Sequence, residues 1–409
     1  MRGALTKSVR YATAADGTRQ AYKWQATGFN LRDQIAGEQY VIPSNETGLG
    51  GTYSYSHAYS AYDGSPTSIT YPAGGGLTIE SVTTKYDTTT GLPTALNTNL
   101  TKVGSYVIGQ QYTGYGEPTV TTMQTTGGSY VERNVSYELD TRRVHEVQVN
   151  PESSAGTVAD DTYQYDASGQ VLSDSDHPQV GADDNQCFVY DQLRRLISAW
   201  TPKTSVDCGT SPTVANLAGP APYWTDWSVD ALGNRTSEVS HTSAGDTRRS
   251  YAVPQGGLNV VRPHAVTGMT TVTPEQSSTT VGYTYDNAGN MISRPGPSGE
   301  TQALTWDAEG HVAKIVEGGK TTTNVYDVDG GRLVSRDGTG STLYLPGMEI
   351  HRSVSGTTST VAGTRYYTFN GGTVASRTIA GLTWLFGDLE GTPHPRRRPL
   401  FRPGRRRTD

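Results

Sequence analysis

Apolar residues are scarce in this chain, where they make up 34% of 409 residues. No window shows sustained helical periodicity, so the sequence does not predict large helical cores. No stretch reaches about 18 consecutive apolar residues, which excludes a membrane-spanning helix, and residues 1–18 lack the apolar segment of a signal peptide. The formal net charge of −6 is mild. Charge therefore gives no general argument for binding nucleic acid.

Motifs that carry catalysis or bind metal ions are also missing. The sequence contains neither His-Glu-x-x-His nor Gly-x-Ser-x-Gly. Residues 318–321 (Gly-Gly-Lys-Thr) resemble the end of a phosphate-binding loop, but Lys314 stands where the first Gly of that loop is required. Residues 327–329 (Asp-Val-Asp) begin like a calcium loop, yet Gly331 and Arg332 replace the third ligand and the turn glycine. We therefore expect no catalytic residue, no cofactor and no metal site.

Cysteine is almost absent. Cys187 and Cys208 are the two in the sequence, and they flank a hairpin at Tyr190 and part of a Pro-rich insertion at residues 202–222. A structural disulfide is the favoured interpretation and would suit an exported protein. Two buried thiols are the alternative. A metal site is not expected, because no Cys-x-x-Cys and no paired His accompany the two residues.

Glycine and tyrosine are abundant instead, with 48 and 25 residues, and a short motif is repeated along the chain. It consists of an aromatic residue, Asp, two variable positions, Gly, an apolar pair and a polar residue. Three copies begin at Tyr285, Trp306 and Tyr326. Asp is favoured at the first position of a type I turn, and Gly at the fourth, where a left-handed backbone costs it little. A type I turn followed by such a Gly commonly joins two antiparallel strands, so each copy predicts a β-hairpin.

The motif recurs outside this stretch. The better copies assign structural roles to Tyr165, Asp166, Gly169, Tyr190, Asp191, Asp230, Gly233, Tyr285, Asp286, Gly289, Trp306, Asp307, Gly310, Tyr326, Asp327 and Gly330. Arg194 stands where the Tyr190 copy should have Gly, and the Asp230 copy has its aromatic residue displaced to Trp227. Looser copies begin at Trp24, Tyr62, Tyr86, Tyr112 and Tyr137. Regular recurrence favours a turn-forming Asp over a catalytic pair, which would be unique in the chain.

These repeats resemble the tyrosine–aspartate (YD) repeats of Rhs and teneurin-like proteins. Residues 186–196 and 302–311 look like the Rhs-repeat proteins of actinobacteria, and the resemblance covers nearly all of residues 20–391. It implies an all-β fold in which an array of β-hairpins forms a spiralling β-sheet shell. Because the chain holds only part of such an array, we expect an incomplete shell. Its open strand edges predict that the isolated chain is poorly soluble or self-associates.

The resemblance also implies a function. Bacterial members of the family enclose a C-terminal toxin, so this chain is expected to be a non-catalytic shell segment, secreted or at the cell surface. Its expected partners are a C-terminal toxin domain or the remaining repeats of a longer protein. Family members carry an Asp-based self-cleavage site after the repeats, but no residue here matches that motif. The alternative is a carbohydrate-binding or adhesion module, which should display several aromatic side chains on one exposed face instead of packing them between repeats.

Three segments are predicted along the chain. Residues 1–60 carry degenerate repeats, and residues 61–391 form the repeat array, with a loop-rich insertion at about 201–280. Residues 392–409 are rich in Arg and Pro and are expected to be disordered. Such a basic tail could bind polyanions by charge alone, but an accidental extension without a role is the favoured interpretation.

Overall fold

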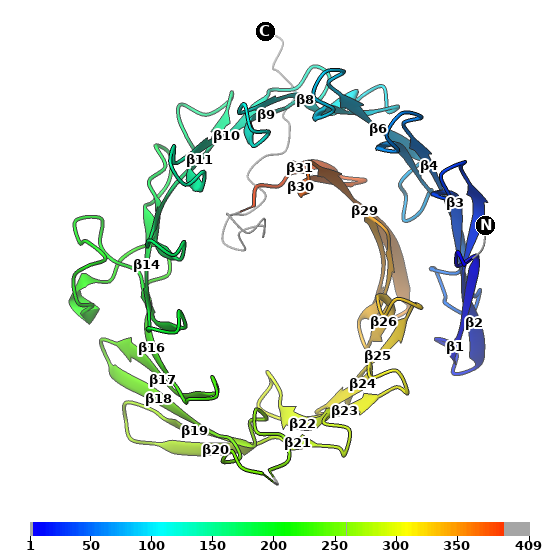
Figure 1. Ribbon diagram of the computed structural model, residues 1–409. Helices are drawn as coiled ribbons and strands as arrows, with labels where there is room; N and C mark the ends of the chain where they lie inside the picture. The colour runs from blue at the N-terminus through cyan, green and yellow to red at the C-terminus, as the bar shows by residue number, and fades with distance from the viewer. Residues whose placement is uncertain (1–2, 259, 388–409) are drawn as a thin grey trace. The chain divides into compact units, whose positions relative to one another are not determined.

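The computed structural model describes residues 3–258 and 260–387, and the tail predicted for residues 392–409 lies outside this part of the chain. Antiparallel β-hairpins follow one another along the sequence (Figure 1). The described residues contain no α-helix, and their one helical segment is the 3-10 turn η1 (Val214–Asn216). No helix among them has the length and hydropathy needed to cross a membrane. The predicted all-β array of hairpins in open sheets is confirmed.

The chain forms two compact units. The described residues of unit 1 are 3–133, 307–315 and 319–387. Its strands are β1 (Lys7–Thr13), β2 (Arg19–Phe29), β3 (Ile35–Ile42), β4 (Gly51–Tyr59), β5 (Pro66–Tyr71), β6 (Glu80–Tyr86), β7 (Pro93–Thr98), β8 (Ser105–Tyr112), β9 (Pro118–Met123), β25 (Lys320–Tyr326), β26 (Arg332–Asp337), β27 (Gly340–Leu345), β28 (Met348–Ser355), β29 (Thr358–Phe369), β30 (Gly372–Thr378) and β31 (Gly381–Trp384).

Unit 2 contains residues 134–306 and 316–318. Its strands are β11 (Val144–Pro151), β12 (Ala159–Tyr165), β13 (Val171–Asp176), β14 (Asp184–Tyr190), β15 (Leu196–Trp200), β16 (Trp224–Val229), β17 (Arg235–Thr242), β18 (Gly245–Ala252), β19 (Gly268–Val272), β20 (Ser278–Gly282), β21 (Thr284–Tyr285), β22 (Met291–Pro295) and β23 (Thr301–Trp306). Strands β10 (Val131–Tyr137) and β24 (Val312–Glu317) run across the division. Between about 201 and 280, irregular loops alternate with β16 to β20.

The motif fixes the register of the hairpins. Strand β12 pairs with β13 from Asp161 opposite Asp176 to Tyr165 opposite Val171, with an irregularity between Gln164 and Tyr165. The same irregularity precedes the last residue of β14, β16, β21 and β25. A type I turn followed by a left-handed residue adds one residue to the hairpin, and this extra residue produces the bulge. The bulge therefore sets the aromatic residue at the end of β12, β14, β21 and β25, and Val229 takes this place in β16.

Unit 1 buries its core between its N-terminal and C-terminal strands. Strands β29 and β30 face β6 and β8, as the contacts of Tyr367 show (Figure 1). Its ring lies 3.8 Å from that of Tyr106 in a stacked arrangement and 6.4 Å from Tyr71 edge-on. Offset and edge-on ring pairs add to the stability gained by burying aromatic area. Unit 2 has a smaller core, in which Cys187 and Trp200 pair across β14 and β15 and are fully buried.

Candidate functional site

Each motif Asp organises its turn by accepting backbone hydrogen bonds. Asp191 Oδ1 accepts N–H bonds from Leu193 and Arg195, each at 2.9 Å. Two backbone bonds close the turn, from Asp191 N to Arg195 O at 3.0 Å and from Arg194 N to Asp191 O at 2.9 Å. Equivalent bonds occur at Asp166, Asp230, Asp286, Asp307 and Asp327. Hydrogen bonds from Arg195 hold the pKa of Asp191 below its usual value, so the carboxylate is committed to the turn.

The fourth position of the turn is left-handed. The backbone φ is between +80° and +95° at Gly169, Gly233, Gly289, Gly310 and Gly330. Arg194, which takes the place of Gly in its copy, adopts φ +61°. A non-glycine residue in this region costs energy that glycine does not. The geometry of the turn thus overrides the preference of Arg194 for a right-handed or extended backbone.

Replacing Arg194 with glycine is therefore expected to stabilise unit 2. Relief of the left-handed strain is partly offset by the greater freedom of glycine in the unfolded chain, so we expect a gain of about 0.5–1 kcal/mol. Urea unfolding measures it. The matched change, Gly233→Ala, places a methyl group where no atom lies within 4 Å, at φ +86°. It should cost about 1 kcal/mol through conformation alone. Equal effects of the two changes would contradict this account.

The aromatic residue of the motif joins each hairpin to the one before it. Tyr165 OH donates to Val144 O at 2.7 Å, and Tyr285 OH donates to Val266 O at 2.8 Å. The same bond is made by Tyr59, Tyr86, Tyr112, Tyr190, Trp306 and Tyr326 to a carbonyl 14 to 24 residues earlier in the chain. A donor at the edge of the ring is needed, and this explains why the motif uses Tyr or Trp. Trp227 differs, because its Nε1 donates to Glu238 at 3.1 Å.

The first two repeats have a different register from the one that the sequence pattern gives. Turn residues 30–34 follow Phe29, and Trp24 lies inside β2. In the next hairpin the strand ends at Tyr59, and Tyr62 is at the tip of the turn. Tyr62-Asp63 thus resembles the start of a motif but lies three residues later than the start.

Removing one of these hydroxyl groups is expected to weaken the stacking of neighbouring hairpins. Tyr285→Phe keeps the ring but leaves Val266 O without the bond, so we expect a loss of about 1 kcal/mol in the free energy of unfolding. Thermal or urea unfolding measures it. Tyr62→Phe is the control, because the side chain of Tyr62 is 96% exposed at its turn tip. A loss at Tyr62 as large as that at Tyr285 would contradict the role of the bond.

A second set of bonds, which we call turn clamps, links neighbouring turns in unit 2. Arg195 Nη1 donates to Asp230 O at 2.8 Å, and Asn234 Nδ2 donates to Pro263 O at 3.1 Å. The other clamps run from Arg143 to Asp166 O, from Gln170 to Arg194 O and from Arg262 to Asp286 O. Sequence reasoning missed them. The available signal was a long polar side chain directly after the fourth turn position, as at Gln170, Arg195 and Asn234.

The structure places Cys187 and Cys208 together as a disulfide. Cys187 is fully buried in β14, and Cys208 lies in the loop between β15 and β16. The bridge therefore fixes this loop, which also carries η1, to the core of unit 2. Its position is that of a structural crosslink within unit 2.

The most deeply buried charges lie in unit 1, in what we call the Glu80 cluster: Glu80, Tyr106, Arg365, Tyr367 and Arg377. Glu80 and Arg365 are fully buried, and Arg365 Nη1 lies 2.6 Å from Glu80 Oε2. Arg377 Nη2 and Tyr367 OH each lie 2.8 Å from the same oxygen. Tyr106 donates to the other oxygen. Residues from β6 and β8 thus hold residues from β29 and β30 by charge.

The protonation states in the Glu80 cluster are fixed by its surroundings. Burial raises the pKa of Glu80, but hydrogen bonds from Thr98, Tyr106, Tyr367 and Arg365 outweigh burial and hold it below its usual value. Burial and the nearby carboxylate raise the pKa of Tyr367 to about 12. Glu80 is thus ionised and its tyrosine partners are neutral at pH 7. Neither Glu80 nor the two tyrosines has its pKa moved toward neutrality, as a general acid or base would require.

A second, smaller cluster in unit 1 also combines a buried glutamate with a tyrosine and an arginine. Glu46 is buried, accepts a hydrogen bond from Tyr22 in β2 and pairs with Arg336 in β26. Arg336 Nε lies 3.0 Å from Glu46 Oε2, and Arg336 Nη2 lies 2.8 Å from Tyr22 OH. Both clusters join a C-terminal arginine to an N-terminal glutamate. They hold the two parts of unit 1 together.

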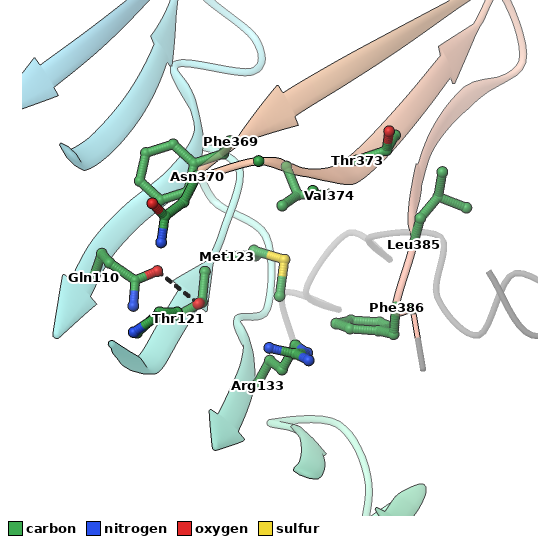
Figure 2. Close-up of a pocket in the computed structure, with 14 residues that line it drawn as sticks. Gln110, Thr121, Met123, Arg133, Phe369, Asn370, Thr373, Val374, Leu385 and Phe386 are labelled. Atoms are coloured by element: carbon green, nitrogen blue, oxygen red, sulfur yellow. Dashed lines mark hydrogen bonds between the residues drawn. The ribbon is translucent and has the colours of Figure 1, made fainter. Parts of the chain in front are cut away.

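A pocket of about 300 Å³ lies in unit 1 beside the end of β31 (Figure 2). Met123, Phe369 and Phe386 give it apolar walls, and Thr121 Oγ1 donates to Gln110 Oε1 at 2.7 Å on one side. Among the described residues that line it there is no carboxylate, histidine or cysteine. The pocket therefore contains no group suited to acid–base or nucleophilic chemistry near neutral pH.

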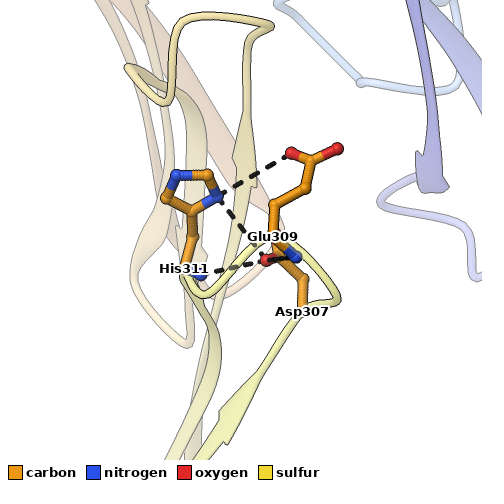
Figure 3. Close-up of side chains that lie close together, drawn as sticks. All are labelled: Asp307, Glu309 and His311. Carbon is orange, nitrogen blue, oxygen red and sulfur yellow. Dashed lines mark hydrogen bonds and ion pairs between the residues drawn. The ribbon is translucent and has the colours of Figure 1, made fainter. Parts of the chain in front are cut away.

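One group of side chains has the composition of a metal site. Asp307, Glu309 and His311 lie close together in a motif turn (Figure 3). Arg10 of β1 pairs with both carboxylates at 2.5 Å, and the His311 Nδ1 atom lies 3.5 Å from Asp307 Oδ1. Asp307 Oδ1 also accepts two turn N–H bonds at 2.9 Å. The Arg10 guanidinium already supplies the positive charge, so the group is an ion-paired turn in which β1 is held to residues 307–311 of unit 1.

Comparison with known proteins gives structural similarity alone. No family model matches the chain, and no curated protein matches its sequence. Solved structures do match: TcdB2-TccC3 superimposes with a TM-score of 0.59 at 16% identity, covering 95% of this chain and 21% of that one. TcdB2-TccC3 without its hypervariable C-terminal region gives a TM-score of 0.58 at 16% identity, covering 91% and 19%. The Photorhabdus luminescens Tc holotoxin pore with a TccC3 mutation gives 0.57 at 16%, covering 95% and 20%.

These matches show the fold. The chain spans about a fifth of the length of the solved chains that it matches. It therefore has the hairpin-array fold of one part of the TcdB2-TccC3 chain. What the larger proteins assemble with or act on is theirs, and it bears on this chain only as a proposal.

Proposed function

We propose that this chain is a non-catalytic wall segment of a shell that encloses a toxin. The observation that carries the proposal is the structural match to TcdB2-TccC3, which covers 95% of this chain and about a fifth of the larger one. A segment of that size within a larger array of hairpins would form one part of the shell wall. Its partners are the remaining repeats of a longer protein and a C-terminal toxin domain, and the assembled protein is secreted or displayed at the cell surface.

The repeat contacts support a wall. Motif aromatics such as Tyr165 and Tyr285 donate a hydrogen bond to a backbone carbonyl of the preceding hairpin. The turn clamps also link neighbouring turns. A structure in which each repeat bonds to its neighbours extends without a separate core, as solenoid proteins do. The motif aromatics are used between repeats, and no specific observation favours the carbohydrate-binding alternative.

The site chemistry supports a non-catalytic role. The motif Asp side chains are held in turns, the Glu80 cluster is a buried ion pair, and Arg10 neutralises the Asp307 group. The pocket beside β31 offers amide, hydroxyl, guanidinium and apolar groups. We propose that the chain positions other segments and performs no reaction itself.

Electron cryomicroscopy of the native protein tests this proposal. The protein is captured from its source cells with an antibody raised against this chain, and its length is measured by mass spectrometry. We expect a polypeptide longer than 409 residues, forming a hollow β-walled particle in which this chain is part of the wall. A native particle without an enclosed space would overturn the proposal, and so would binding of the native protein to a glycan array through exposed aromatic side chains.

A further inference from the structure

Strand β1 pairs with β2 alone within the described part of the chain. Two backbone bonds mark the ends of this pairing, from Ala26 N to Thr6 O at 2.9 Å and from Ala14 N to Thr18 O at 2.8 Å. Because the bonds of an antiparallel pair alternate, the even-numbered residues from 6 to 14 turn their backbone groups toward β2. The backbone N–H and C=O groups of residues 7, 9, 11 and 13 therefore point to the other side of β1.

The outer side of β1 has the form of an edge that accepts another strand. Exposed edges are often closed by a very short strand, a proline or a bulge. Strand β1 has seven residues, none of them proline, and its register with β2 has no irregularity. An edge of this kind can pair with many strands, so the identity of its partner must come from the residues around it.

The residues before β1 have the conformation and spacing of a motif turn. Gly3 is left-handed with φ +96°, close to the +95° of Gly169 in a complete copy of the motif. Leu5 follows Gly3 by two positions, as Val171 follows Gly169. Strands alternate in direction, so the connection before β1 lies at the same edge of the sheet as the turn at residues 30–34 between β2 and β3. These features give β1 the place of the second strand in a motif hairpin.

The bonding pattern of β1 agrees with this place. In the hairpin of β12 and β13, a bond from His177 N to Asp160 O at 3.0 Å continues the register, so residues 173, 175 and 177 bond to β12. They stand four, six and eight positions after Gly169. The same positions after Gly3 are residues 7, 9 and 11, which point away from β2. The backbone groups on the outer side of β1 are thus the ones that a motif hairpin uses to bond its first strand.

The hairpin of β14 and β15 shows the same pattern independently. A bond from Thr201 N to Tyr223 O at 3.0 Å turns residue 201 toward β16, so residues 198 and 200 bond to β14. These two residues stand four and six positions after the left-handed Arg194. The alternation is therefore a property of the motif, and β1 shares it.

We propose that the outer side of β1 binds an extended strand that ends in the aromatic residue and Asp of a motif. The backbone of this strand bonds to residues 7, 9 and 11 in the register of the motif hairpins, as in β-strand addition, where main-chain bonds supply the affinity. For the source of the strand, the inference rests on the wall proposal: the strand comes from the preceding repeat of a longer protein. That a motif strand fits this edge follows from β1 itself.

An N-terminal extension of the full chain tests the proposal. The added residues repeat residues 320–327, Lys-Thr-Thr-Thr-Asn-Val-Tyr-Asp, directly before Met1. Met1 and Arg2 then take the two variable positions, and Gly3 completes the motif Tyr-Asp-x-x-Gly. Hydrogen exchange measured by NMR compares the extended and unaltered chains. We expect at least tenfold slower exchange at the amides of residues 7, 9 and 11, and little change at residues 8 and 10, which already bond to β2.

Two variants distinguish strand pairing from the mere presence of added residues. In the first, the extension carries Thr321→Pro and Thr323→Pro, at the positions that correspond to Asp160 and Thr162 of β12 and would donate to β1. Residues 7, 9 and 11 should then exchange as in the unaltered chain. In the second, Val9→Pro removes an amide that points away from β2, a place where an edge strand tolerates proline. It should leave the unaltered chain folded and cancel the slower exchange at residues 7 and 11 of the extended chain.

Unchanged exchange at residues 7, 9 and 11 in the extended chain would overturn the proposal. Slow exchange at these amides in the unaltered chain that increases with protein concentration would also overturn it, because it would assign the edge to a second copy. These outcomes are separate from those of electron cryomicroscopy. A native particle without an enclosed space would overturn the wall proposal, and the exchange pattern would still decide whether β1 binds a motif strand.

Discussion

Replacing Glu80 with glutamine is expected to lower the free energy of unfolding of unit 1 by about 3–5 kcal/mol, because it leaves buried positive charge without a counterion. Arg365 is fully buried and loses its ionic partner, and Arg377 loses the same partner. Glutamine is close to glutamate in size, so the loss reports charge and not a cavity. Urea unfolding at pH 7 measures it.

The control is the same substitution at an exposed ion pair. Glu309 pairs with Arg10, but its side chain is 62% exposed. Glu309→Gln should cost at most about 1 kcal/mol, as surface ion pairs do. If the two substitutions cost the same, the Glu80 cluster does not hold β29 and β30 against β6 and β8 by charge.

The effect of Glu80→Gln should depend on pH. The folded pKa of Glu80 is below its ordinary value of 4.5, so the carboxylate stabilises the fold above pH 4.5, and this contribution is lost as the pH falls through the folded pKa. The difference between the two proteins should therefore be constant from pH 5 to 8 and shrink in more acidic solution. A difference that grows on acidification would contradict an ionised Glu80.

Local features of the fold could be predicted from the sequence, and long-range ones could not. The Asp and Gly of each motif act within five residues, so the turn at Asp230 and Gly233 follows from turn chemistry alone. The sequence analysis noted Arg194 in the place of Gly, and the structure shows that Arg194 adopts the left-handed backbone of that place. The register of the second repeat did not, because Tyr62-Asp63 imitates a motif start at a turn tip. The sequence pattern alone cannot distinguish a motif start from a turn tip.

The Glu80 cluster was not foreseeable from spacing. Glu80 meets Arg365, which is 285 residues later in the chain, and nothing near either residue indicates the pairing. It arises because β29 and β30 pack against β6 and β8, which is a consequence of tertiary structure. The turn clamps lie between these extremes, since each reaches only to the next connection at the same edge of the sheet. A search for polar donors directly after the fourth turn position would have found Gln170, Arg195 and Asn234.

Removing the disulfide is expected to lower the free energy of unfolding of unit 2 by about 3 kcal/mol, because Cys187 and Cys208 close a loop over 21 residues of sequence separation. The variant C187A/C208A should show this loss in urea unfolding. Dithiothreitol should produce a similar loss in the unaltered protein and no further change in the variant, which separates the crosslink from the cavity left at buried Cys187. The loop between β15 and β16 should also become sensitive to trypsin at Lys203 before the rest of unit 2 unfolds. An unaltered protein whose stability and cleavage do not respond to the reductant would show that the loop is held by its other contacts, such as the Lys203 N to Asn216 O bond at 2.8 Å, and not by the disulfide.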